Sequence, residues 1–116
     1  KKTKEIKLNE DKYNFDLMKL LQLSDQSFRN KFSGSPIKRI GRDRFLRNCC
    51  IAAGNSENRK LVPYLINLLF NDDSSLVRGA AVWAIQQIGN HQTLMKTKKN
   101  HLIFEKERSV IDEWYI

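Results

Sequence analysis

The stretch that decides the fold is residues 74–90, which read SSLVRGAAVWAIQQIGN. Its apolar side chains recur every three or four positions, the spacing that gathers them on one face of an α-helix. They are Leu76, Val77, Ala80, Ala81, Ala84, Ile85 and Ile88. Small alanines in such a row let a second helix approach closely, so the stretch predicts a long helix inside a helical core, ended by Gly89 and Asn90.

A second stretch repeats this pattern. Residues 47–55, RNCCIAAGN, echo the arginine, the small apolar residues and the closing Gly-Asn pair of residues 78–90. The two arginines are 31 positions apart and the two Gly-Asn pairs 35, and a weaker third copy begins near Val110. Periods in this range are typical of stacked helical pairs. We expect Gly54 to end its helix in the left-handed conformation that glycine adopts readily.

The rest of the chain also has helical patterns. Apolar residues from Phe15 to Leu21 have helical spacing, Ser24 is placed to cap a short helix that carries Phe28 and Phe32, and Ser35-Pro36 is placed to start another turn. Further helices are predicted over residues 43–53, 59–70, 94–104 and 108–115. No segment alternates as a strand. The sequence predicts an all-α fold of about six to seven helices over residues 15–116, after a flexible lead-in at residues 1–14.

The positive charge of the chain is concentrated in one region. Among 116 residues, 21 Lys and Arg stand against 13 Asp and Glu, a net charge of +8. Residues 29–47 hold seven of the cations and one acid, Asp43. Arginine's planar fork of donors suits phosphate, so we predict a polyanion site here. Its candidate residues are Arg29, Lys31, Ser35, Lys38, Arg39, Arg42, Arg44 and Arg47.

Other features exclude several classes of protein. No apolar run reaches 18 residues and no signal peptide starts the chain, so we expect no membrane span and a reduced, cytoplasmic setting. Adjacent Cys49 and Cys50 suit neither a disulfide framework nor a four-ligand metal site, and core packing is their expected role. His91 and His101 are expected at helix ends or on the surface. We expect Trp114 to dock on the preceding helix.

One pattern in the chain resembles the HEAT repeat. It consists of Leu69, Phe70, Asp72, Leu76, Val77, Arg78, Ala81, Ala84 and Ile85. The resemblance implies a short α-α superhelix, with Asp72 in a turn and Arg78 on the second helix of a pair. In that family these two residues are chiefly structural.

A longer ordered set of motifs resembles the carboxy-terminal part of epoxyqueuosine reductases. It comprises FxxxFxGSPIKR at residues 28–39, RN followed by AAGN within residues 47–55, and DxxxLVRGAAxWAI at residues 72–85. The resemblance implies a fragment of a bacterial oxidoreductase that modifies the tRNA wobble base with two [4Fe–4S] clusters and cobalamin. The repeat domain of that family helps to hold the tRNA.

The sequence departs from that enzyme family in one decisive way. The cysteines that bind the clusters and the domain that binds cobalamin are absent, so no cofactor is expected in this chain and it should not catalyse the reduction alone. We therefore predict a tRNA-binding fragment that grips the anticodon stem-loop for a catalytic domain elsewhere. The alternatives are a protein-interaction scaffold with a basic loop and, less well supported by the residues, a helical-repeat nucleic-acid glycosylase.

Overall fold

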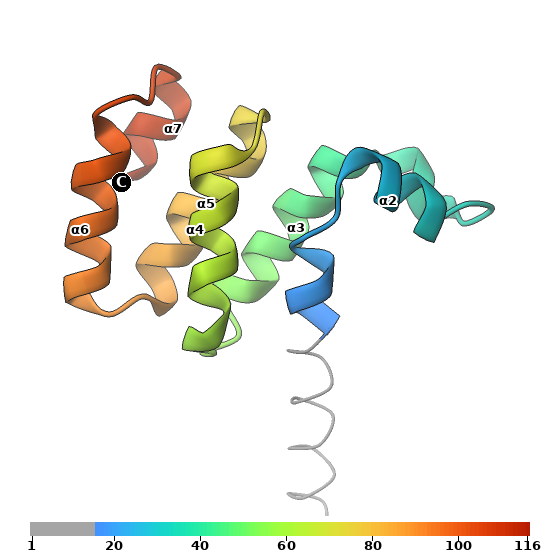
Figure 1. Cartoon of the computed structure of the whole chain (residues 1–116), viewed down its shortest axis with the longest axis horizontal. Helices are drawn as coiled ribbons and strands as arrows, with labels where there is room; N and C mark the ends of the chain where they lie inside the picture. Colours follow the sequence, from blue (N-terminus) through green and yellow to red (C-terminus); the bar gives the residue numbers. More distant parts are fainter. Residues whose placement is uncertain (1–15) are drawn as a thin grey trace, which may run out of the picture.

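The computed structural model describes residues 16–116, and every regular element within them is helical. Residues 16–20 are helical, and the later elements run in the order α2 (Asp25–Lys31), η1 (Pro36–Ile40), α3 (Arg42–Gly54), η2 (Arg59–Leu61), α4 (Val62–Asn71), α5 (Ser75–Ile88), α6 (His91–Leu102) and α7 (Arg108–Glu113) (Figure 1). The all-α prediction is confirmed. Phe15 and the predicted lead-in at residues 1–14 lie outside the described residues.

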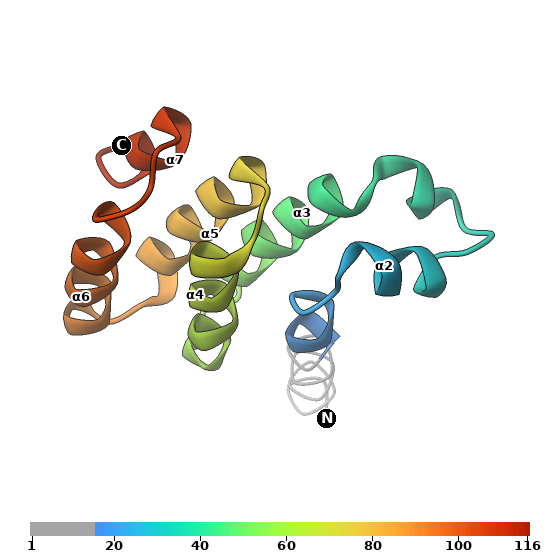
Figure 2. The ribbon, with the colours of Figure 1, turned by 45° about the horizontal axis from the view of Figure 1, so that its top comes forward.

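The helices form two rows. α3, α5 and α7 pack side by side in one row, and α4 and α6 lie in the other, with α4 against α5. Figures 1 and 2 show helical residues 16–20 continuing the row of α4 and α6. The described chain is thus a stack of three helical pairs, in which residues 16–20 pair with α3, α4 with α5, and α6 with α7. Each pair covers the apolar face of the next, as stacked repeats require.

Five of the described helices, α2, η1, η2, α5 and α6, begin after a polar residue whose side chain accepts from one of the first free backbone N–H groups. Ser24 and Ser27 form a reciprocal capping box before α2, and Ser35 caps η1, as the sequence predicted. α6 begins at His91, three residues before the predicted start. The side chain of Asn90 accepts a hydrogen bond of 2.8 Å from the N–H of Thr93, so Asn90 starts one helix as well as following another.

Gly54 is the last residue of α3, and its expected left-handed conformation is wrong. The described glycines with positive φ are Gly34 and Gly41. A Cβ at Gly54 would lie 2.5 Å from Cζ3 of Trp83, which is closer than real contacts allow. Glycine is needed at this position because the indole of Trp83 on α5 packs directly against the backbone of α3.

Cys49 and Cys50 lie in the apolar core, as predicted, together with Leu46, Leu65 and Ile85. Neither cysteine is in a disulfide. Burial raises the pKa of both thiols to about 12, because a thiolate loses its hydration there. Metal clusters require thiolates, so this cysteine pair does not suit a cluster.

His101 lies in the last turn of α6, so its expected place at a helix end is confirmed, but it is fully buried and the surface alternative is wrong. The indole Nε1–H of Trp114 donates to Nδ1 of His101 at 2.9 Å. An indole N–H only donates, so the ring proton of neutral His101 is on Nε2, which lies 2.9 Å from Oε1 of Glu105 and donates to it. Trp114 thereby docks α7 on α6, as predicted, with 5% of its surface exposed.

Candidate nucleic-acid interface

Arg42 belongs to an internal joint of the repeat stack. Its guanidinium forms two hydrogen bonds with the carboxylate of Asp72, at 2.6 and 3.0 Å, and its Nε donates to the carbonyl of Leu23 at 3.1 Å. Asp72 lies in the turn between α4 and α5 and also accepts from the N–H of Ser74. The side chains of Arg42 and Asp72 are 13% and 7% exposed. The hydrogen bonds to Asp72 raise the pKa of Arg42 above its ordinary value.

Arg78 forms the same joint one pair further along the stack. Its guanidinium pairs with both carboxylate oxygens of Glu105, at 2.8 and 3.1 Å, and donates to the carbonyls of Asp72 and Asp73. The predicted structural role of Arg78 is therefore confirmed. Asp72 and Glu105 are 33 positions apart, one repeat period. The arginine equivalent to Arg78 is thus Arg42, and the predicted match of Arg47 with Arg78 is wrong.

Glu105 is stabilised in its charged form by this network. Burial alone would raise its pKa, but hydrogen bonds from Arg78, His101 and the N–H of Glu107 outweigh that effect and lower the pKa to about 2. Every buried polar side-chain atom of the described residues has a hydrogen-bond partner, so the joint is internally satisfied. Glu105 and Arg78 therefore use most of their hydrogen-bonding capacity on the fold.

The cations of the predicted site lie mainly on an insertion within the first helical pair. In the second pair, residues 72–74 connect α4 to α5. In the first pair, residues 24–41 separate the first helical turn from α3 and form α2, a loop and η1, a segment that we call the basic arm. The basic arm projects at one end of the molecule, with its loop at the far right of Figures 1 and 2.

The basic arm has two glycine turns and an aromatic anchor. Gly34 and Gly41 have φ of 77° and 86°, which side chains disfavour, so glycine permits both turns. The rings of Phe28, Phe32 and Phe45 pack together with centroids 4.9 to 5.4 Å apart. Phe28 and Phe32 come from the arm and Phe45 from α3, so this cluster anchors the arm to the repeat stack.

The predicted site residues differ in whether their side chains already have partners within the fold. Lys38, Arg39 and Arg44 are exposed and form no ion pair with any residue from 16 to 116. Lys38 and Arg39 line a shallow hollow of about 640 Å³ with Gly34, Ser35 and Pro36. The hydroxyl oxygen of Ser35 accepts from the N–H of Ile37, so its proton remains available as a donor.

Three other predicted residues lie nearby and are partly engaged. Arg29 forms an exposed ion pair of 2.8 Å with Asp25, and the ammonium of Lys31 lies 6.0 Å from the ring centre of Phe32. Arg47 is half-buried on α3, where its Nε donates to the side chain of Asn48. Arg42 differs from the other predicted residues because each of its three guanidinium nitrogens already donates a hydrogen bond at the joint.

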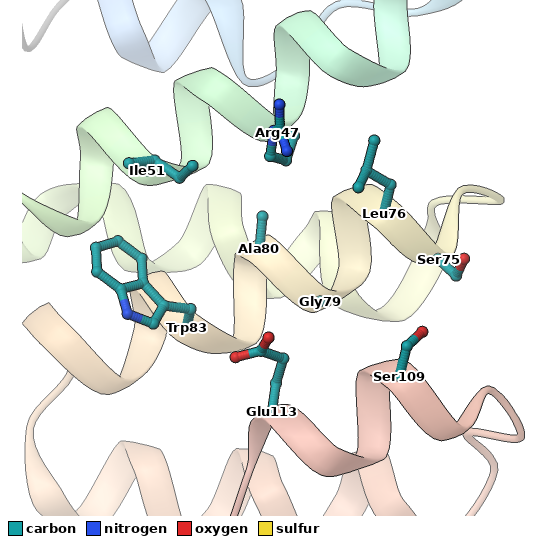
Figure 3. A pocket seen from close by; sticks show the side chains of 9 residues that line it. All are labelled: Arg47, Ile51, Ser75, Leu76, Gly79, Ala80, Trp83, Ser109 and Glu113. Atoms are coloured by element: carbon teal, nitrogen blue, oxygen red, sulfur yellow. The ribbon is translucent and has the colours of Figure 1, made fainter. Parts of the chain in front are cut away.

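A groove that sequence reasoning missed lies between α3, α5 and α7. Its volume is about 410 Å³. Figure 3 shows Arg47 and Ile51 on the α3 side, Ser109 and Glu113 on the α7 side, and the α5 residues between them. Those α5 residues are Ser75, Leu76, Gly79, Ala80 and Trp83. The sequence signal that could have found this groove is Gly79, a glycine in the middle of a strongly helical stretch.

Residues 44–88 match the family described as HEAT-like repeat. That match covers α4, α5 and all of α3 except its first two residues, so it includes Asp72 of the joint, and Arg42 lies just before it. These residues form a HEAT-like repeat. The rest of the stack continues the same two-row arrangement.

The chain is also similar to several longer proteins. It is 34% identical over 92 residues to an uncharacterized protein of Geobacillus stearothermophilus, covering 79% of this chain and 41% of that protein. Epoxyqueuosine reductases of Lactococcus garvieae and Xanthomonas campestris are 32% identical over 95 residues and 36% identical over 73 residues. These matches cover 82% and 63% of this chain, and 27% and 21% of the enzymes. No solved structure matches the chain significantly.

The similarity is a distant, partial homology to the carboxy-terminal region of epoxyqueuosine reductases. This chain spans between about a fifth and two fifths of the length of these relatives. Within residues 16–116, no cluster of His, Cys, Asp or Glu is arranged to hold a metal ion. No helix in that range is long and apolar enough to cross a membrane.

Proposed function

We propose that this HEAT-like region binds tRNA and holds its anticodon stem-loop for an epoxyqueuosine reductase reaction carried out by other parts of the parent enzyme. The observation that carries the proposal is the basic arm, an insertion into a repeat that exposes cations without acidic partners among the described residues. Unneutralised lysine and arginine side chains attract a polyanion, because binding releases the counterions condensed on it. The homology to epoxyqueuosine reductases supports the choice of tRNA as that polyanion.

The role of this region is positioning. Lys38 and Arg39 at the tip, with Arg44 on the adjoining helix, contact successive phosphates, and Arg29, Lys31 and Ser35 add contacts along the arm. Arg47 extends the same cationic surface along α3, while Arg42 keeps the base of the arm fixed on the repeat stack. Phosphate contacts of this kind set the register of an RNA without reading its sequence. The two cysteines of the sequence are too few to bind two [4Fe–4S] clusters, so we assign the reduction itself to the catalytic domain of a cytoplasmic enzyme.

The test is a charge reversal at the tip of the basic arm. The double variant Lys38→Glu/Arg39→Glu is expected to weaken tRNA binding strongly and to reduce the slope of log affinity against log salt by about 1.8, because each phosphate that a cation neutralises on a duplex adds about 0.9 to that slope. Filter binding across a salt series measures both quantities.

The chain offers a closely matched control. Arg59 and Lys60 are exposed and lie in η2, a short 3-10 helix like η1, with Asn58 capping it as Ser35 caps η1. Arg59→Glu/Lys60→Glu makes the same charge change away from the arm and should leave tRNA affinity nearly unchanged. If the two double variants weaken binding equally, net charge alone explains the binding and the proposal fails. Capture of an acidic protein without any tRNA binding would instead favour the scaffold alternative.

A further inference from the structure

The groove between α3, α5 and α7 holds polar groups that the fold itself does not use. The carboxylate of Glu113 forms no hydrogen bond or ion pair with any residue of the described chain, and the indole N–H of Trp83 and the hydroxyl of Ser109 also lack partners there. In the guanidinium of Arg47 only Nε donates a hydrogen bond, and its acceptor is the side chain of Asn48. Between these groups the floor is apolar, with Ile51 and Leu76 about 40% exposed. Few polar groups around an apolar floor are typical of a small-ligand site, and about 410 Å³ is within the range of such sites.

Gly79 is a second, independent sign that the groove is kept open. Glycine inside a helix is less favourable than alanine, because its backbone loses more conformational freedom on folding. A Cβ at Gly79 would meet only Cγ of Glu113, at the ordinary contact distance of 3.7 Å, so the packing of this chain does not require glycine there. The contrast is Gly54, where a Cβ would collide with Trp83. The missing side chain at position 79 leaves room beneath Glu113 for a ligand to approach the helix backbone.

The charges of the groove indicate which ligand fits. Arg47 and Glu113 come from opposite sides, and they form no ion pair with each other. A ligand that spans them has an anionic group at one end, hydrogen-bond donors at the other, and a flat apolar body between. An RNA nucleotide has this form. Unpaired bases are commonly read by stacking on side chains and by hydrogen bonds to their Watson–Crick edge.

We propose that this groove binds one unpaired guanine nucleotide of an RNA. The phosphate faces Arg47, the base lies over Ala80 and beside Trp83, and Glu113 accepts hydrogen bonds from the base edge. Guanine is the preferred base because its N1–H and N2–H₂ groups lie side by side and match the two oxygens of a carboxylate. Uracil presents a carbonyl oxygen on each side of its one N–H, and these repel a carboxylate.

This inference rests on the proposed function, because it takes the RNA to be the one bound by the basic arm. The two surfaces are continuous along α3. Arg44 and Arg47 are three positions apart, so they are neighbours on that helix, one next to the arm and the other at the groove. A backbone that follows the arm cations onto α3 reaches the groove without leaving cationic surface.

The first test uses guanosine and uridine monophosphates as probes and the two tryptophans as reporters. In a ¹⁵N-resolved NMR titration of the whole chain, GMP should shift the indole N–H signal of Trp83. The signal of Trp114, whose N–H is buried on His101, should stay in place. UMP should bind at least about tenfold more weakly, since it lacks the paired donors. Equal shifts with both nucleotides, or a Trp83 signal that does not move with GMP, would overturn the proposal.

Two variants test the assignment without unfolding the chain. Gly79→Ala favours the helix, so the fold is kept, while its methyl group narrows the groove and should weaken GMP binding about tenfold. Glu113→Gln should reduce the preference for GMP over UMP to less than about threefold, with Asp112→Asn on the same helix as its matched control. Unchanged GMP binding in Gly79→Ala, or an unchanged preference in Glu113→Gln, would contradict the assignment.

RNA hairpins then separate this inference from the proposed function. Two hairpins that differ only in carrying guanine or uracil at one loop position should differ in affinity for the wild type and bind alike to Gly79→Ala. Reversing Lys38 and Arg39 should weaken both hairpins while leaving the GMP titration unchanged. If the charge reversal does not change the affinity for either hairpin, the proposed function is wrong. The GMP titration then decides by itself whether the groove binds a guanine nucleotide. If the wild type binds the two hairpins with equal affinity, the proposed guanine site is wrong, while the proposal that the basic arm binds RNA is unaffected.

Discussion

The first and second helical pairs share one joint and differ in the segment that connects their helices. In both pairs an arginine near the start of the second helix binds an acid in the turn of the next pair, Arg42 with Asp72 and Arg78 with Glu105. In the second pair the two helices are joined by residues 72–74, whereas in the first the basic arm of residues 24–41 is inserted.

This difference shows that the joint, rather than the length of the connection, fixes the geometry of the stack. The arm leaves after Leu23 and returns at Arg42, and Arg42 ties these two points together by donating to the carbonyl of Leu23. An insertion whose ends are held in this way is free to carry a separate function. Arginine therefore has two roles here: Arg42 and Arg78 are largely buried and paired at the joints, whereas Arg39 on the arm is exposed and has no ion-pair partner among the described residues.

The largest expected effect on stability is at the joint between Arg42 and Asp72. Asp72→Asn leaves the guanidinium of Arg42 with a neutral partner, and breaking a nearly buried pair in this way should cost about 4 kcal/mol of unfolding free energy. Urea denaturation measures the change. Asp73→Asn alters the adjacent, exposed side chain and should cost less than about 0.5 kcal/mol. Similar losses in the two variants would show that the joint does not organise the stack.

The joint between Arg78 and Glu105 should make the stability of the fold depend on pH. The pKa of Glu105 is lowered from about 4.5 to about 2, so its contribution is complete above pH 4.5 and is lost as the pH falls toward 2. The shift corresponds to about 3 kcal/mol. Denaturation at pH 7 and at pH 2.5 should show the wild type losing more stability than Glu105→Gln. Glu107→Gln, in the same turn, should behave like the wild type; a Glu105→Gln profile parallel to the wild type would contradict the assignment.

The hinge between the arm and the stack should give a smaller effect. Gly41 has φ of 86°, and nothing lies within 4 Å of a Cβ built there, so Gly41→Ala adds backbone strain without a collision. Strain of this kind costs about 1–3 kcal/mol. The expected result is a fall in melting temperature, measured by calorimetry, that is smaller than that of Asp72→Asn. An unchanged melting temperature would contradict the prediction, because it would show that the backbone conformation at position 41 does not require glycine.

The smallest effect on stability is expected at the tip of the arm. Lys38→Gln/Arg39→Gln removes two exposed cations that have no ion-pair partner in residues 16–116, so the free energy of unfolding should change by less than about 0.5 kcal/mol. The same double change should weaken tRNA binding. Loss of stability comparable to that at a joint would show that these cations support the fold.

Much of the fold could be predicted from local sequence. The period of three to four in residues 74–90 gave the helix that became α5, and Ser24 and Ser35 gave helix starts that the structure confirms. Such signals are local, since an apolar stripe or a cap involves residues a few positions apart. The site was predicted less completely. Clustered charge pointed to the basic arm, but charge alone did not distinguish Arg42 from its exposed neighbours.

By itself, the sequence determined the helical fold, the repeat period and the position of the basic segment, because each of these follows from spacing along the chain. Tertiary structure alone decided which arginines are buried, since the acids that bind Arg42 and Arg78 lie 30 and 27 positions away. It also decided that His101 is internal, because Trp114 returns to cover it, and that Gly54 serves close packing rather than a turn. These features depend on contacts between residues that are far apart in the sequence and meet only when the helices stack. Local sequence patterns therefore do not predict them.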